Sequence, residues 1–259
     1  MIRITEAFKK GKAFIPFITG GDPDLDTTRS LILEMQDAGA DLIEIGVPFS
    51  DPIAEGPVIQ EADERALQGG CTTDRLFDMV ESLKDRMHIP MVFMTYINPV
   101  FSYGMDRFMD RCQRAGIAGL IVPDLPYEEK GEIYDSCHAK DLELVSMIAP
   151  TSKERIRMIA GEAEGFLYCV SSLGVTGVRQ QFDTDIESMI KLAKEETSIP
   201  CCVGFGISTP EQAGKMASVS DGAIVGSAIV RIIAEHGKDS APYVRKYVEE
   251  MVRAVKDAG

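Results

Sequence analysis

Apolar residues along this chain gather into eight short aliphatic runs, which alternate with longer segments where apolar residues recur every three or four positions. Short apolar runs are typical of buried parallel strands, and the longer period is typical of amphipathic helices. Strands alternating with helices over about 250 residues predict a (β/α)8 TIM barrel. A doubly wound open sheet is the alternative, disfavoured because no G-x-G-x-x-G motif follows the first run. The runs lie at 13–19, 41–47, 91–96, 119–124, 142–148, 165–171, 200–206 and 221–227.

Capping residues and glycines mark the helix boundaries. Ser152 precedes one helical segment, and Thr209 precedes another that begins with Pro210; these residue types stabilise the first turn of a helix. An extra N-terminal helix is expected at 2–10, where it would cover the barrel floor. The other clear helical patterns lie at 24–38, closing at Gly39, at 57–69, at 106–115, closing at Gly116, and at 128–140.

Composition narrows the class of protein. The 259 residues are 45% hydrophobic and contain no linker-like tract, so residues 1–259 are expected to form one domain. A net charge of -14 disfavours nucleic acid and anionic membranes as partners. Six cysteines without a C-x-x-C pair and three separated histidines predict reduced thiols and no metal site. Neither a signal peptide nor a membrane-spanning run is recognisable, which predicts a cytoplasmic protein.

One carboxylate lies inside an aliphatic run. In the second run Leu42, Glu44 and Gly46 share one face of the predicted strand, and Ile43 and Ile45 share the other. Glu44 therefore points away from the face that packs on helices, into the barrel interior. An ionised carboxylate there is costly unless it has a partner or a chemical task.

Glycine clusters follow the last three strands, at 174–179, 204–208 and 226–230. These are the C-terminal strand ends, where barrel enzymes keep their active sites and often bind phosphate. Backbone amides at a helix start such as Gly226-Ser227 favour an anion. Any one cluster is equally explained by a tight turn, but three on one rim predict a phosphate site. The polar segment 171–183 is predicted to be a mobile lid.

Seven motifs together carry a family resemblance. In this order along essentially the whole chain, they resemble the alpha subunit of tryptophan synthase. That resemblance implies a (β/α)8 barrel that cleaves indole-3-glycerol phosphate into indole and glyceraldehyde 3-phosphate by a retro-aldol reaction, with neither metal nor organic cofactor. The motifs are PFITGGDP (16–23), EIGVPFSDPIAEGPVIQ (44–60), Y-x-N (96–98), VPDLP (122–126), GVTG (174–177), GFGIS (204–208) and GSAIV (226–230).

The resemblance implies two catalytic acids. Glu44 matches the family's general acid/base; the alternative is a core acid paired with a lysine or arginine. Glu55 occupies the position where most relatives have Asp, whose carboxylate contacts the indole N–H. Glu can take this role if the loop withdraws by about one methylene; the alternative is a solvated loop acid.

The remaining site residues also follow from the resemblance. Phe17 and Phe205 would flank the indole, and Ile121 would line the same pocket unless it is a plain core residue. Tyr168 would lie near the glycerol chain, and Thr176 of the lid would help to position Asp51. The phosphate would be held by Gly177, Gly206, Gly226 and Ser227.

The partner implied is the tryptophan synthase beta subunit, a pyridoxal-phosphate enzyme, in a complex of two alpha and two beta chains. The loops after the second, third and sixth strands would contact it, and pyridoxal phosphate itself is not expected on this chain. Two alternatives remain open: another phosphate-binding barrel enzyme, such as a phosphosugar isomerase, or a catalytically weak allosteric activator of the beta subunit.

Overall fold

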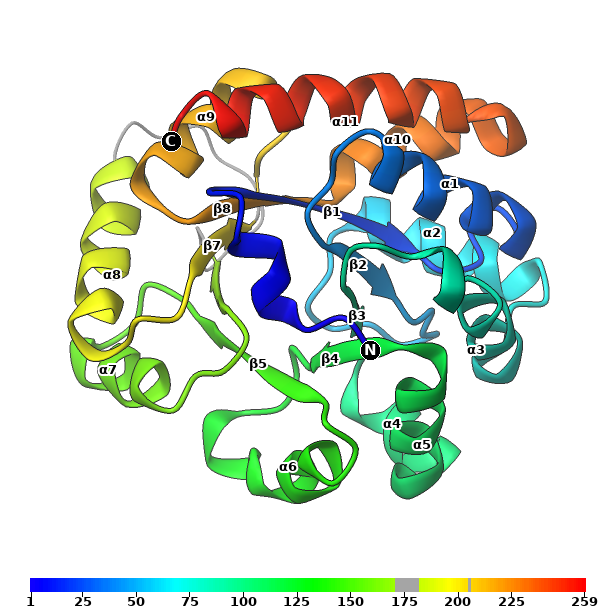
Figure 1. Cartoon of the computed structure of the whole chain (residues 1–259). Coiled ribbons are helices and arrows are strands. Elements are labelled where there is room, and N and C mark those ends of the chain that lie inside the picture. Colours follow the sequence, from blue (N-terminus) through cyan, green and yellow to red (C-terminus); the bar gives the residue numbers. More distant parts are fainter. Residues whose placement is uncertain (171–181, 205) are drawn as a thin grey trace.

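Each aliphatic run forms a parallel strand that pairs with its neighbours in sequence, and the first strand pairs with the last, so the sheet closes into a barrel (Figure 1). This confirms the predicted TIM barrel. The computed structural model describes residues 1–170, 182–204 and 206–259. Its strands are β1 (Ala13–Thr19), β2 (Ile43–Gly46), β3 (Met91–Met94), β4 (Ile117–Ile121), β5 (Glu143–Ile148), β6 (Leu167–Val170), β7 (Cys201–Gly204) and β8 (Gly222–Val225).

Helices surround the barrel on the outside (Figure 1). The α-helices are α1 (Leu25–Asp37), α2 (Pro57–Gln68), α3 (Thr73–Glu81), α4 (Ile97–Tyr103), α5 (Met105–Ala115), α6 (Gly131–His138), α7 (Lys153–Gly161), α8 (Phe182–Glu196), α9 (Pro210–Val219), α10 (Ser227–His236) and α11 (Ala241–Lys256). Short 3-10 turns are η1 (Ile4–Phe8), η2 (Lys84–Arg86), η3 (Tyr127–Glu129) and η4 (Gly237–Asp239).

The predicted helix starts are confirmed. The Ser152 side chain accepts a hydrogen bond from the Arg155 amide, and Thr209 forms a capping box with Gln212. The predicted helix at 128–140 is shorter in the structure, because a 3-10 turn precedes α6 and Gly131, a weak helix former, begins it. Strand β4 begins earlier than predicted, since Gly116 ends α5 in a left-handed conformation and leads directly into the strand.

Side chains of the strands divide between two apolar layers. Ile43 and Ile45 pack in the layer between sheet and helices, whereas Leu42 belongs to an interior cluster with Val92 and Ile121. The alternation expected for β2 is therefore present, and it turns the Leu42 face towards the barrel axis.

The N-terminal turn η1 lies across one end of the barrel (dark blue in Figure 1). Ile4 and Ala7 are buried in the interior cluster, and the Ile4 amide donates to a Glu143 carboxylate oxygen at 3.4 Å. The predicted helix at the floor is confirmed in place, but it is a 3-10 turn of five residues.

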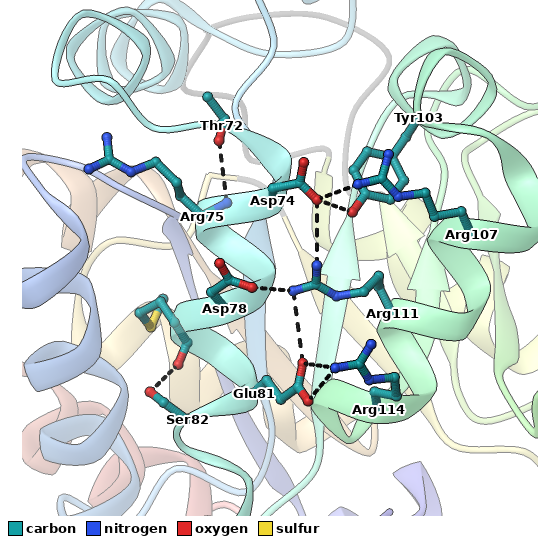
Figure 2. Close-up of polar contacts among 11 residues, drawn as sticks. Thr72, Asp74, Arg75, Asp78, Glu81, Ser82, Tyr103, Arg107, Arg111 and Arg114 are labelled. Atoms are coloured by element: carbon teal, nitrogen blue, oxygen red, sulfur yellow. Dashed lines mark hydrogen bonds and ion pairs between the residues drawn. The ribbon is translucent and has the colours of Figure 1, made fainter.

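Helices α3 and α5 are joined by a ladder of opposite charges (Figure 2). Asp74, Asp78 and Glu81 of α3 face three arginines of α5, and both sets recur at helical spacing. Arg111 lies at the centre, 3.4 Å from Asp74 and 2.6 Å from Asp78, with its guanidinium over the Phe77 ring. Its side chain is 13% exposed, whereas that of Arg114, which pairs with Glu81 at 3.0 Å, is 64% exposed.

This difference in exposure predicts that replacing each arginine by alanine lowers the free energy of unfolding by a different amount. Arg111→Ala should lower the free energy of unfolding by about 1–3 kcal/mol, since it removes a partly buried cation and its aliphatic packing. Arg114→Ala should cost less than about 0.5 kcal/mol, because water screens an exposed pair. Urea unfolding of both variants measures this, and equal losses would contradict it.

Candidate active site

Glu44 lies in the middle of β2, level with Phe17 of β1 and Val92 of β3. It is 1% exposed, and its Oε2 atom has no hydrogen-bond partner among the described residues. None of the ion pairs in the described part of the chain includes Glu44. The alternative of a core acid neutralised by a basic side chain therefore finds no support in that part of the molecule.

The surroundings of Glu44 favour its protonated form. Burial raises the pKa of this carboxyl to about 8, and the charge of nearby Glu55 adds to the shift. Tyr168 of β6 is buried on the same interior, and its hydroxyl, whose pKa burial also raises, feels the Glu44 charge. At neutral pH this raised pKa favours the protonated form of Glu44.

Glu55 lies in the loop between β2 and α2, directly before the Gly56 N-cap. The Tyr96 hydroxyl fixes this loop by accepting hydrogen bonds from the Ile53 and Ala54 amides, at 3.1 and 2.8 Å. Glu55 is half-buried, close enough to Glu44 for their charges to interact. The alternative of a solvated loop acid is therefore wrong, and the two predicted acids lie together.

Sequence reasoning missed a third acid, Asp63. It lies on the buried face of α2, with Ile59, Ala62 and Ala66, and is 4% exposed. Its side chain is hydrogen-bonded to that of Glu55, and burial raises the pKa of both carboxyls. A carboxylate on the apolar stripe of an amphipathic helix was the available signal.

The predicted aromatic residues pack against glycines at the strand ends. A Cβ atom on Gly46 would lie 2.7 Å from the Phe17 ring, and one on Gly204 would lie 2.5 Å from the Tyr168 hydroxyl. Glycine is needed at both positions because any side chain would displace a ring. Ile121 is fully buried in the interior cluster. Phe17, Tyr168 and Ile121 thus line the interior that holds Glu44.

The described part of the predicted phosphate site is the start of α10. Gly226 is its N-cap and Ser227, which is exposed, its first residue. Helix bonding begins at the Val230 amide, which donates to the Gly226 carbonyl, so the amides of the first turn remain available to an anion. Gly206, with φ +75°, borders open space. Thr176, Gly177 and Phe205, and most of the predicted lid, lie outside the described residues.

One cavity in the structure does not coincide with the candidate site. A cavity of about 430 Å³ opens between α1 and α3, and Gly21, Asp24, Arg29 and Arg75 are among the residues that line it. Within the described residues, no cluster of three potential metal ligands occurs, and no helix is long and apolar enough to cross a membrane.

A closed (β/α)8 barrel with buried acids inside and a helix start at its C-terminal rim defines a TIM-barrel enzyme. The family model for the tryptophan synthase alpha chain matches residues 5–258. This chain therefore belongs to the tryptophan synthase alpha chain family.

Relatives and solved structures agree with this membership. The chain is 43% identical to the tryptophan synthase alpha chain of Lacticaseibacillus casei over 258 residues, 100% of this chain and 97% of the relative. It is 47% identical to that of Caldanaerobacter subterraneus, covering 90% and 89%. The crystal structure of the alpha subunit from Legionella pneumophila superposes with a TM-score of 0.90 at 36% identity, covering 99% of each chain.

The raised pKa of Glu44 predicts a pH-dependent stability. The folded state keeps this proton up to about pH 8, whereas the unfolded chain releases it near pH 4.5, the ordinary pKa of a glutamate. Between these values the native state binds one more proton, so stability falls as pH rises, by up to about 1.4 kcal/mol per pH unit from this group. Glu44→Gln should flatten that decline in urea unfolding between pH 5 and 8; parallel profiles would contradict the assignment.

The Tyr96 contacts predict a local loosening in Tyr96→Phe. The variant keeps the ring, which packs on Phe49, but removes the acceptor for two loop amides, at a cost of about 1 kcal/mol. Hydrogen exchange should accelerate at Ile53 and Ala54. Tyr243→Phe, at an exposed position, is the matched control and should leave these amides unchanged.

Proposed function

We propose that this chain cleaves indole-3-glycerol phosphate with Glu44 as general acid and base and Glu55 as the partner of the indole nitrogen. Family membership supplies the reaction, a carbon–carbon lyase reaction of the alpha chain. The observation that carries the residue assignment is the burial of the Glu44 carboxyl, which faces the barrel interior near Glu55 and whose pKa burial raises to about 8.

The proton balance of the reaction suits one such carboxyl. Glu44 donates its proton to indole C3, and the ring becomes a cation with its charge spread to the nitrogen. The resulting carboxylate then takes the proton of the glycerol hydroxyl next to the breaking bond. As that C–C bond breaks, its electron pair returns to the ring, the hydroxyl carbon becomes the aldehyde, and Glu44 regains its proton.

Glu55 supports this step by stabilising the positive charge that develops on the indole ring. A carboxylate that accepts the indole N–H stabilises the ring cation more than the neutral substrate, and so lowers the barrier. The second observation in its favour is the Glu55 Oε2 atom, buried and without a hydrogen-bond partner in the described structure.

We assign the phosphate group of the substrate to the C-terminal rim of the barrel, across its opening from the two acids. Gly206, Gly226 and Ser227, with Gly177 outside the described residues, would bind the phosphate, and amides rather than lysines would do so in a chain of net charge -14. Phe17, Phe205 and Ile121 would hold the indole, with Tyr168 near the glycerol and Thr176 closing the site.

The family also implies a beta-subunit partner, and one solved structure similar to this chain is tryptophan synthase from M. tuberculosis, with a TM-score of 0.87 at 30% identity. We propose an assembly of two alpha and two beta chains in the cytoplasm. The six free cysteines suit a reducing compartment. Pyridoxal phosphate would belong to the beta chain.

Indole release from indole-3-glycerol phosphate, with and without the beta subunit, tests the function. Glu44→Gln should lower turnover by at least about 100-fold, since Gln cannot transfer a proton, while binding of indole-3-propyl phosphate is retained. Glu143→Gln is the matched control. This glutamate of β5 is partly buried and contacts η1 at the barrel floor, away from Glu44, so the turnover of the variant should equal that of the wild type.

Three other outcomes would contradict the proposal. Turnover retained in Glu44→Gln would remove the acid/base assignment. No indole from the wild-type chain under either condition would favour the catalytically weak activator of the beta subunit, and cleavage of unrelated phosphosugars would favour another barrel enzyme.

A further inference from the structure

The contact between Glu55 and Asp63 joins two carboxyl groups directly. A carboxylate only accepts hydrogen bonds, so a hydrogen bond between two such groups requires one proton between them. Water has little access to the contact, since Asp63 is buried on α2 and Glu55 is half-buried. Two ionised carboxylates in direct contact and away from water would repel each other strongly. The pair therefore carries one negative charge and one proton.

The neighbours of the pair decide where the proton resides. The Tyr96 hydroxyl, at the N-cap of α4, accepts the two loop amides and lowers the pKa of Glu55. Burial and the charges of Glu55 and Asp22 raise the pKa of Asp63 more than the Phe49 amide lowers it. Asp22 is itself held by Arg65 through two hydrogen bonds of 2.8 Å. Glu44 on β2 adds a further carboxyl beside Glu55. These contacts favour charge on Glu55 and the proton on Asp63.

We propose that Asp63 is a positioning residue for the lyase reaction: its protonated carboxyl donates a hydrogen bond to Glu55, and this leaves the free Oε2 atom of Glu55 to accept the indole N–H. The inference rests on the proposed function of Glu55. It also accounts for the buried Oε2 atom, which has no partner among the described residues. A longer side chain at position 55 needs such an anchor, because it has one more rotatable bond to fix than aspartate.

The arrangement sets a pH dependence with a defined sign. Burial and the charge of Glu55 raise the pKa of Asp63, so its carboxyl is protonated at neutral pH and loses its proton only under alkaline conditions. Once Asp63 ionises, it no longer donates, and the two carboxylates repel. Glu55 would then lose its orientation as pH rises.

Three variants on α2 separate the possible roles of Asp63. Asp63→Asn keeps a donor of the same shape but cannot ionise. Asp63→Ala removes the donor altogether, and Glu64→Gln, at the exposed neighbouring position, is the control. The cleavage rate of each is measured against pH with indole-3-glycerol phosphate, and kcat and KM are determined separately.

Asp63→Ala should lower kcat by about tenfold with little change in KM, because the oriented carboxylate acts on charge that exists only in the transition state. Asp63→Asn should restore most of that loss. The ratio of its kcat to that of the wild type should rise with pH above 8, and the ionisation of Glu44 cancels in this ratio. If Asp63→Ala matches Glu64→Gln in kcat, or if the Asn ratio is flat with pH, the proposal is wrong.

A carboxyl carbon-13 NMR titration of the free protein tests the pair without any turnover. In the wild type the Glu55 and Asp63 resonances should show coupled titration. In Asp63→Asn, Glu55 should titrate alone, with its midpoint moved to lower pH. An unmoved Glu55 midpoint would overturn the shared proton even if the chain is an active lyase. A wild-type chain that shows the coupled titration but releases no indole would instead overturn the proposed function.

Discussion

The candidate site depends on burying a carboxyl group in an apolar enclosure, where none of the described residues offers it a counter-charge. Water would hold Glu44 ionised at neutral pH, whereas burial inside the closed barrel, with η1 across its floor, disfavours the anion. A lysine or arginine beside it would have restored the charge and removed the proton. The chemistry of the interior therefore depends on Glu44 and equally on the lack of a basic side chain beside it among the described residues.

The same constraint links three acids on three elements. Glu44 belongs to a rigid strand, Glu55 to a loop tied to Tyr96, and Asp63 to a helix. Each would be ionised alone in water, but burial raises the pKa of all three, and the charge of Glu55 adds to the shift for Glu44 and Asp63. The proposed function assigns the proton transfer to the acid on the rigid strand and the ring nitrogen to the acid on the loop.

Local patterns predicted the barrel because strand and helix periods agree with the topology at every step. The direction of Glu44 followed from strand alternation, and the cap at Ser152 followed from residue type. Asp63 could not be recognised as part of the site in this way. Its role depends on α2 folding back over the loop that carries Glu55, a contact between elements that no local period encodes. For Glu55, the sequence allowed both a solvated and a buried carboxylate, and only the packing around Tyr96 and Asp63 decides between them.

The short N-terminal turn limits how small molecules can enter and leave the barrel interior. Ile4 and Ala7 seal one end with side chains that pack as tightly as the core, so that end offers no passage. The opposite end, the C-terminal rim, is then the route by which a small molecule would enter and leave the interior. Indole formed beside Glu44, as proposed, would leave through that rim, so a chain that covers the rim would control its release.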